Sequence, residues 1–384
     1  MGPRVIALYL PQFHPVDIND RVRGKGFTEW RNVATSKPLF YKHYQPRIPA
    51  DLGFYDLRLK ETRNLQAEYA KKFGIEGFCY WHYWFGNGKT VLERPLNDVI
   101  DCNEPEFPLC VGRAIHDRKT NTWERDVRKR NNNFIFKQEF FGDGDYIKHF
   151  EYLLKVFKDE RYIKVDGKLL FLIYGADKIP DLKHFLSLWN ELAVKQGFKG
   201  FHFVAVVETL AKIDLFNISD LRGTIRKNLD WYFLNGFNAV NTVNQKYAEF
   251  MYNGKIVKAL KATLRKINSN IFLEKYNYKK IMENFYTQLE REEYIYPQLL
   301  AGWDRSPRSG NKAIIYYDDV PENFRFAVKK CFELIKSKES EHQIVILNSW
   351  NEWGEGAFVE PDLKYGLGKL EILSEEINAF KKDC

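Results

Sequence analysis

The sequence predicts an α/β fold, a single (β/α)8 barrel that spans residues 1–384 as one domain. Short apolar segments rich in β-branched residues recur eight times, and most of the intervals between them have helical patterns. The eight segments end in Trp, His, Glu or Asp side chains, as expected where parallel strands open into catalytic loops. A chain of 384 residues could also form two domains, but we find no repeat, low-complexity stretch or Gly/Ser linker that would divide it.

The expected elements follow one another along the whole chain. The eight strands are predicted at 4–9, 74–80, 107–113, 168–174, 201–207, 230–234, 294–301 and 344–347. Helices are predicted at 57–73, 182–195 and 324–336, with a helical insertion around 246–290. The basic run at 125–130 indicates a solvated helix face, and Asp143-Gly144-Asp145 is typical of a helix start.

The composition favours a globular enzyme over a nucleic-acid-binding or membrane-spanning protein. The net charge of +8 is modest for this length, and no nucleic-acid-binding motif is present. No stretch approaches the roughly 18 apolar residues of a membrane span. Aromatic residues make up 16% of the chain, which suits a cleft lined by rings as well as a large core.

The cysteine pattern and the N-terminus predict a cytoplasmic location. Five cysteines form no CxxC motif, and two of them, Cys79 and Cys110, lie in expected buried strands. The first apolar run ends at Pro11 and is too short for a signal peptide core.

One part of the helical insertion has a basic amphipathic pattern. Ile256, Leu260, Leu264 and Ile267 lie opposite Lys255, Lys258, Lys261 and Arg265 at helical spacing. An ordinary surface helix is the default interpretation, and peripheral contact with a membrane or a lipid-linked glycan is the alternative.

Residues 343–361 contain the strongest chemical signal. The apolar run at 344–347 leads directly into Trp350-Asn351-Glu352-Trp353-Gly354-Glu355. Tryptophan faces suit sugar rings, and paired carboxylates cleave acetals, so this pattern predicts a carbohydrate site with Glu352 and Glu355 as catalytic residues. A solvated loop with two surface glutamates is the alternative.

Other polar and aromatic residues follow further predicted strands, and a barrel would bring them to the same mouth. The expected substrate-binding residues are Tyr9, Gln12, His14, Glu29, Trp30, Tyr80, His82, Trp303, Asp304, Trp350, Asn351, Trp353 and Glu360. His14, His82, His116 and Asp304 lack the spacing of a zinc site, so we expect no metal and no cofactor.

Several of these segments together resemble the WbsX family. They are Tyr9-Leu10-Pro11-Gln12-Phe13-His14-Pro15, Gly26-Phe27-Thr28-Glu29-Trp30, Phe78-Cys79-Tyr80-Trp81-His82-Tyr83-Trp84, Gly302-Trp303-Asp304 and Trp350-Asn351-Glu352-Trp353-Gly354-Glu355-Gly356. WbsX proteins are commonly described as glycosyltransferases of bacterial surface polysaccharide clusters, and they look related to the family 99 endo-α-mannosidases, which are (β/α)8 barrels.

The resemblance implies a retaining mechanism carried by a Glu-x-x-Glu motif that falls on Glu352 and Glu355. Glu352 would act as a base on the 2-hydroxyl of the sugar, giving a 1,2-anhydro intermediate, and Glu355 would be the general acid and base. Apolar surroundings and the charge of Glu352 predict a raised pKa for Glu355. Where the family usually has Ala-Asn-Glu after the third strand, this chain has Ala114-Ile115-His116.

The preferred hypothesis is an endo-acting glycoside hydrolase-like enzyme with an oligosaccharide or polysaccharide substrate. The alternatives are a glycosyltransferase of O-antigen or capsular polysaccharide biosynthesis and a non-catalytic glycan-binding barrel. The transferase would need a nucleotide site, and the sequence contains neither a Gly-rich phosphate loop nor an Asp-x-Asp metal motif. The sequence does not set the sugar, the linkage or the oligomeric state.

Overall fold

Eight parallel strands close into a barrel in the computed structural model, which describes residues 2–120, 124, 133–211, 213, 219–267 and 272–383. The strands are β1 (Arg4–Tyr9), β2 (Gly77–His82), β3 (Leu109–Ala114), β7 (Lys168–Tyr174), β8 (Phe201–Glu208), β9 (Ala239–Val243), β11 (Ile295–Leu300) and β14 (Ile344–Asn348). They pair in this order, and β14 pairs again with β1 to close the ring. This confirms the predicted (β/α)8 fold.

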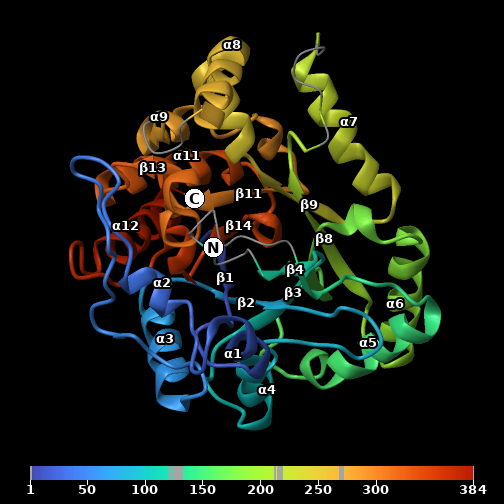
Figure 1. The fold of residues 1–384 in the computed structure, drawn as a ribbon. Coiled ribbons are helices and arrows are strands. Elements are labelled where there is room, and N and C mark those ends of the chain that lie inside the picture. The colour runs from blue at the N-terminus through green and yellow to red at the C-terminus, as the bar shows by residue number, and fades with distance from the viewer. Residues whose placement is uncertain are drawn as a thin grey trace.

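Helices surround the barrel on its outside, as Figure 1 shows. They are α3 (Lys60–Lys72), α4 (Arg94–Asp101), α5 (Asp143–Phe157), α6 (Leu182–Lys195), α7 (Leu221–Leu234), α8 (Gln245–Ile267), α9 (Tyr278–Glu283), α11 (Pro321–Ile335) and α12 (Gly368–Asp383). Shorter helices are α1 (Asp17–Arg23), α2 (Trp30–Ala34) and α10 (Ser306–Ser309), all in loops at the ends of strands.

Short strands decorate the loops. A hairpin is formed by β4 (Arg118–Lys119) and β5 (Phe134–Phe136), and β6 (Lys164–Val165) adds to β7. A three-stranded sheet joins β10 (Glu274–Asn277), β13 (Ile314–Tyr317) and β12 (Trp303–Asp304), while β15 (Asn351–Glu352) pairs with β16 (Ala357–Phe358).

Much of the aromatic excess lies between the barrel and its helices. Trp189 on α6 is fully buried, and its ring centroid lies 4.9 Å from Phe185, 5.1 Å from Phe171 and 5.6 Å from Phe201. Phe157 on α5 packs on the same group at 6.1 Å from Trp189. Rings of this size bury large apolar areas, so they hold α5 and α6 against β7 and β8.

The sixth strand is the error in the predicted element order. Residues 230–234 lie in α7, and the sixth strand is β9, Ala239–Val243. The aromatic run Trp231-Tyr232-Phe233 looks like a strand, but Tyr232 is buried while Trp231 is 41% exposed, as on one helix face. Strand β9 carries Asn241 and Thr242, both fully buried, which weakens its apolar signal.

The predicted insertion around 246–290 contains α8, β10 and α9. Helix α8 is interrupted at Gly254, whose φ is 68°. Leu260 is exposed, whereas most other side chains of the predicted amphipathic face lie outside the described part of the chain, as does the basic run at 125–130. No helix of the described residues is both long and apolar enough to cross a bilayer.

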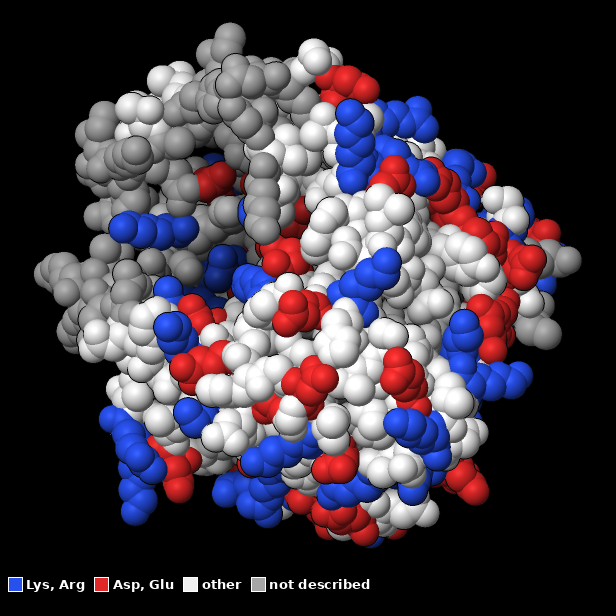
Figure 2. Space-filling model, turned by 90° about the vertical axis from the view of Figure 1, so that its right-hand side faces the viewer, with Lys and Arg blue, Asp and Glu red and all other residues white. Residues whose placement is uncertain are grey.

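Charged side chains are well mixed over the face shown in Figure 2, where blue and red atoms are interspersed. The net charge of +8 is therefore not gathered into one basic patch on that face.

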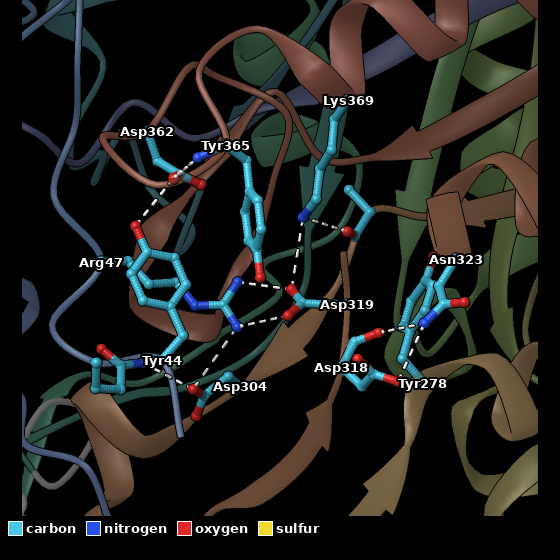
Figure 3. A network of polar contacts seen from close by, with 12 residues as sticks. Tyr44, Arg47, Tyr278, Asp304, Asp318, Asp319, Asn323, Asp362, Tyr365 and Lys369 are labelled. Atoms are coloured by element: carbon cyan, nitrogen blue, oxygen red, sulfur yellow. Dashed lines mark hydrogen bonds and ion pairs between the residues drawn. The ribbon is translucent and has the colours of Figure 1, made fainter. Parts of the chain in front are cut away.

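A buried polar network fastens the long loop between β1 and α3 to the loops after β11 and β13, as Figure 3 shows. Arg47 Nη1 donates to Asp319 Oδ2 at 2.7 Å, and Asp319 also lies 3.5 Å from Lys369 Nζ. Arg47 and Asp319 are both nearly inaccessible to solvent. Removing one partner of such a pair leaves a buried charge without compensation.

We therefore expect Arg47→Ala to lower the free energy of unfolding by about 3–5 kcal/mol, because Asp319 and Asp304 lose their shared cation. The matched control is Arg58→Ala in the same loop, because the partly exposed Arg58–Asp56 pair contributes at most about 1 kcal/mol. Chemical denaturation of both variants measures the difference, and equal midpoints would contradict this role for Arg47.

Candidate functional site

A pocket of about 600 Å³ opens at the C-terminal mouth of the barrel. All eight barrel strands contribute to its wall, through Leu8, Trp81, Ala114, Tyr174, Glu208, Val243, Gln298 and Asn348. Four aromatic side chains, Trp81, Tyr83, Tyr174 and Trp303, also line it. A concave site with several rings and a few polar groups is typical of small-molecule and sugar binding.

A single guanidinium group binds three glutamates at one side of this pocket. Arg308 Nη2 lies 2.8 Å from Glu29 Oε2 and 2.9 Å from Glu352 Oε1, and Nη1 lies 2.8 Å from Glu355 Oε1. Arg308 Nε donates to the other oxygen of Glu29. Arg305 adds a second cation, with Nε 3.0 Å from Glu355 Oε1. We call Arg305, Arg308, Glu29, Glu352 and Glu355 the Arg308 cluster.

The backbone around Gly354 is shaped to receive the Glu29–Arg308 pair. A Cβ atom on Gly354 would lie 1.9 Å from Glu29 Oε1 and 2.9 Å from Arg308 Nε. Gly354 lies between Glu352 and Glu355 in the sequence. Because it has no side chain, it leaves the space through which Glu29 reaches Arg308. Gln12 completes the contact, because its Nε2 donates to Glu29 and lies 3.3 Å from Glu352 Oε1.

Asp304 holds the short helix that carries Arg308. Its Oδ1 accepts the N–H of Ser306 at 2.9 Å, at the first residue of α10. Its Oδ2 accepts from Gln45 at 2.7 Å and contacts His43 Nε2 at 2.8 Å. Burial opposes the ionised form, but His43 and Arg47 lower the pKa of Asp304 to about 2, so it stays charged. The fully buried Asp304 thus positions Arg308 and does not line the pocket.

The charges of the Arg308 cluster balance when the cluster holds one proton. Two arginines face three carboxylates, so one carboxyl must be neutral for the cluster to carry no net charge. Burial, opposed by Arg308 and assisted by Glu29 and Glu355, raises the pKa of Glu352 to about 8. Burial also disfavours the ionised form of Glu355, but Arg308 and Arg305 outweigh it and lower its pKa.

This order of pKa values is the reverse of the one expected from the sequence. Glu355 was expected to be raised, but it has two arginine partners, whereas Glu352 shares Arg308 with Glu29. Burial thus favours the protonated form of Glu352, and the two arginines favour the ionised form of Glu355.

A second buried network supports the Trp350–Glu355 segment from behind. Glu360 accepts from Gln66 Nε2 at 2.6 Å, Trp353 Nε1 at 2.6 Å and Tyr55 OH at 2.9 Å, and burial raises its pKa to about 7. Tyr9 OH donates to Gln66 Oε1 at 2.7 Å. The ring of Trp353 stacks on Phe358 at 3.7 Å between centroids.

Of the residues predicted to bind substrate or act in catalysis, the pocket brings together Gln12, Trp303, Glu352 and Glu355. Asn351 instead binds the backbone of Leu10: its Oδ1 accepts the Leu10 N–H at 2.8 Å, and its Nδ2 donates to the Leu10 carbonyl at 3.0 Å. Trp350 packs on Phe78. Trp30 packs on Phe13, and His14 is buried. The pocket wall therefore does not include Tyr9, His14, Glu29, Trp30, Tyr80, His82, Asp304, Trp350, Asn351, Trp353 or Glu360.

The side chains of strand β2 that face the pocket are not the ones we expected. Trp81 and Tyr83 face the pocket, whereas Tyr80 packs on Tyr9 outside the barrel at 4.5 Å between ring centroids. His82 Nε2 lies 2.9 Å from His149 Nε2 on α5, and burial lowers the pKa of His82 to about 3. Since side chains alternate along a strand, Trp81 and His82 cannot share a face.

Several pocket residues were missed by sequence reasoning. Besides Trp81 and Tyr83 they include His116, Arg118, Tyr174, Lys178, Glu208, Lys246, Glu249, Arg305 and Arg308. Glu208 lies directly after the predicted strand 201–207, and Arg305 lies in the loop after the predicted strand 294–301, so the strand-end rule could have found them. Arg308 lies inside Ser306-Pro307-Arg308-Ser309, which gives no chemical signal of its own.

A group of side chains close enough to share a metal ion occurs, within the described residues, at Glu293, Glu339 and His342. None of the three lines the pocket, and His342 already bridges Glu293 Oε1 at 2.7 Å and Asp166 Oδ2 at 3.0 Å.

Solved structures with a similar fold include a glycoside hydrolase-like protein and a family 99 endo-α-mannosidase from Bacteroides thetaiotaomicron. The first has a TM-score of 0.60 and 15% identity, with 98% of this chain and 94% of that one covered. The second has a TM-score of 0.55 and 13% identity, with 99% of both chains covered. At these identities, the likeness concerns the fold.

Sequence comparison gives relatives over almost the whole chain. Two proteins described as uncharacterized protein WxcX, from two strains of Xanthomonas campestris pv. campestris, are each 30% identical over 374 residues, which is 97% of this chain. The chain spans about half the length of these relatives, 49% of each. Residues 5–373 match the family described as Glycosyltransferase WbsX, so this chain belongs to the WbsX family.

Proposed function

We propose that this chain is a carbohydrate-active enzyme that cleaves within a bacterial polysaccharide, with Glu352 and Glu355 as its acid–base pair. The observation that carries the proposal is the shared bonding of both carboxyl groups to Arg308 at the wall of an aromatic-lined pocket. Acid–base cleavage of a glycosidic bond needs one protonated and one ionised carboxyl group. The raised pKa of Glu352 and the lowered pKa of Glu355 supply that combination.

The pocket supports this reading in other ways. Trp81, Tyr83, Tyr174 and Trp303 offer ring faces to a saccharide, and Gln12 and Gln298 offer amides to its hydroxyl groups. The barrel core and the network behind Trp353 fix the candidate pair on rigid elements, as acid–base geometry requires.

The pKa shifts of the two glutamates and the family resemblance point to different residues as the proton donor. The resemblance assigns proton donation to Glu355, but Arg305 and Arg308 both stabilise its ionised form. The raised pKa of Glu352 favours this residue as the donor to the leaving oxygen. Donation by Glu355 would require substrate binding to move the proton across the cluster.

A glycosyltransferase is the second candidate, because the family to which the chain belongs carries that description. The same pair could pass a sugar to an acceptor hydroxyl in place of water. Calorimetry with nucleotide sugars and an assay for oligosaccharide release from bacterial polysaccharides separate the two. A non-catalytic glycan-binding barrel would bind glycan without turnover, and its binding would survive loss of both glutamates.

Replacing either glutamate tests the pair. We expect Glu352→Gln and Glu355→Gln each to lower the cleavage rate by roughly a hundredfold or more, because glutamine keeps the shape but cannot exchange a proton. Circular dichroism and glycan binding serve as controls for folding. Full activity in both variants would contradict the assignment.

An activated leaving group identifies the donor, because it departs without full protonation. We expect an aryl glycoside of the cleaved sugar to restore more rate to Glu352→Gln than to Glu355→Gln. Restoration in Glu355→Gln instead would show that substrate moves the proton, as the family scheme implies.

Arg308 should set the pH range of activity. If Glu352 must be protonated and Glu355 ionised, activity falls above about pH 8 and falls again below the lowered pKa of Glu355. Arg308→Gln removes the cation that stabilises both ionised carboxylates, so both limbs of the profile should move to higher pH.

The control for that experiment is Arg325→Gln on α11, which removes the same charge from a surface pair with Glu322 and Glu375. It should leave the profile in place. An unchanged profile in Arg308→Gln would contradict the role given to Arg308, and thermal melting shows whether that variant keeps its fold.

A further inference from the structure

The basic side chains of the pocket differ in how far they are already paired. Arg305 and Arg308 bind the carboxylates of their own cluster. Lys246 pairs with Glu208 on the neighbouring wall. Lys178 Nζ donates to the carbonyl of Ile115 at 2.9 Å and, among the described residues, lies within ion-pair distance of no carboxylate. An ammonium group has three donors, so Lys178 keeps two for a ligand.

His116 stands beside Lys178 on the same wall. Both line the pocket, and burial together with the positive charges of Lys178 and Arg118 lowers the pKa of His116 to about 4. The Nδ1 atom of His116 is buried and has no hydrogen-bond partner among the described residues. A neutral imidazole offers one N–H donor, so His116 adds a hydrogen-bonding group to the wall that carries Lys178.

The strands that lead to Lys178 and to Glu352 lie on opposite sides of the barrel. The ring order β14–β1–β2–β3–β7 places β7, which leads to Lys178, opposite β14, which leads to Glu352. His116 follows β3, the neighbour of β7. A saccharide that fills the mouth would therefore meet Glu352 on one side and Lys178 on the other, while Glu208 on the strand next to β7 is already paired with Lys246.

We propose that the His116–Lys178 wall binds an oxyanion substituent of the glycan, a carboxylate or a phosphate carried by a sugar. The substrate is then an acidic polysaccharide rather than a neutral one. An anion at this position takes up the free donors of Lys178 in charge-assisted hydrogen bonds and offsets the positive charges of Arg118 and Lys178. The inference rests on the proposed function and gives its substrate class.

Small sugars of matched shape provide the binding test. Glucuronate, glucose 6-phosphate and methyl glucoside are titrated into the purified full chain by ligand-observed NMR. We expect one of the two anionic probes to bind about tenfold or more tightly than the neutral one, with an affinity that falls as salt rises. The probe that binds distinguishes a carboxylate substituent from a phosphate.

Variants test whether the His116–Lys178 wall causes the preference for anionic sugars. Lys178→Met should abolish it, whereas Lys178→Arg should keep most of it and Lys183→Met, an exposed charge on α6, should leave it unchanged. His116→Gln keeps a neutral hydrogen-bond donor and should weaken the preference less than Lys178→Met. Equal binding of neutral and anionic probes, including failure of all to bind, overturns the inference, as does a preference that survives Lys178→Met.

A polymer assay keeps this inference separate from the proposed function. An acidic bacterial polysaccharide and its charge-reduced form, made by carboxyl reduction or by removal of phosphate according to which probe binds, share linkages and differ in charge. Glu352-dependent cleavage of the reduced form as fast as the acidic one would sustain the hydrolase and overturn the anion site. Anion preference in the binding test with no cleavage of any polymer would sustain the site and overturn the hydrolase.

Discussion

The guanidinium group of Arg308 is the constraint on which the candidate site depends. It joins Glu29 from the β1–α3 loop to Glu352 and Glu355 from the loop after β14, and so connects segments more than 300 residues apart in sequence. Like-charged carboxylates would repel one another without it. Arg308 lies on α10, and Asp304, which contacts His43 and Gln45 of the β1–α3 loop, accepts the N–H of Ser306 at the start of that helix.

The barrel could be predicted because parallel strands buried on both faces appear as continuous apolar runs. Strands β1 and β7 begin and end where the sequence placed them, and β14 differs by one residue. The sixth strand was predicted at the wrong place because β9 contains buried polar residues and is not a continuous apolar run. Buried Asn241 donates to the carbonyl of Tyr296, and Thr242 donates to Glu290, so polar residues there are satisfied by partners distant in sequence. The residues that neighbour Asn241 and Thr242 in the sequence give no indication of those partners.

The site could be predicted only in part, since sequence position gives the end of a strand but not the direction of a side chain. Glu352 and Glu355 lie at the pocket wall, as their motif predicts. The aromatic and amide residues of the same motif face inward, where Asn351 binds Leu10 and Trp353 donates to Glu360. The role of Arg308 could not be predicted from the sequence, because it depends on three contacts that form only in the folded protein.

The motif therefore divides its residues between two tasks. Trp350, Asn351 and Trp353 anchor the segment to the barrel, while Gly354 opens the space for Glu29 and Arg308, so that two glutamates are presented in different electrostatic surroundings. The difference arises because Glu355 contacts two arginines and Glu352 shares one with Glu29. Two carboxyl groups of identical chemistry thus acquire pKa values shifted in opposite directions through the number of cations each contacts.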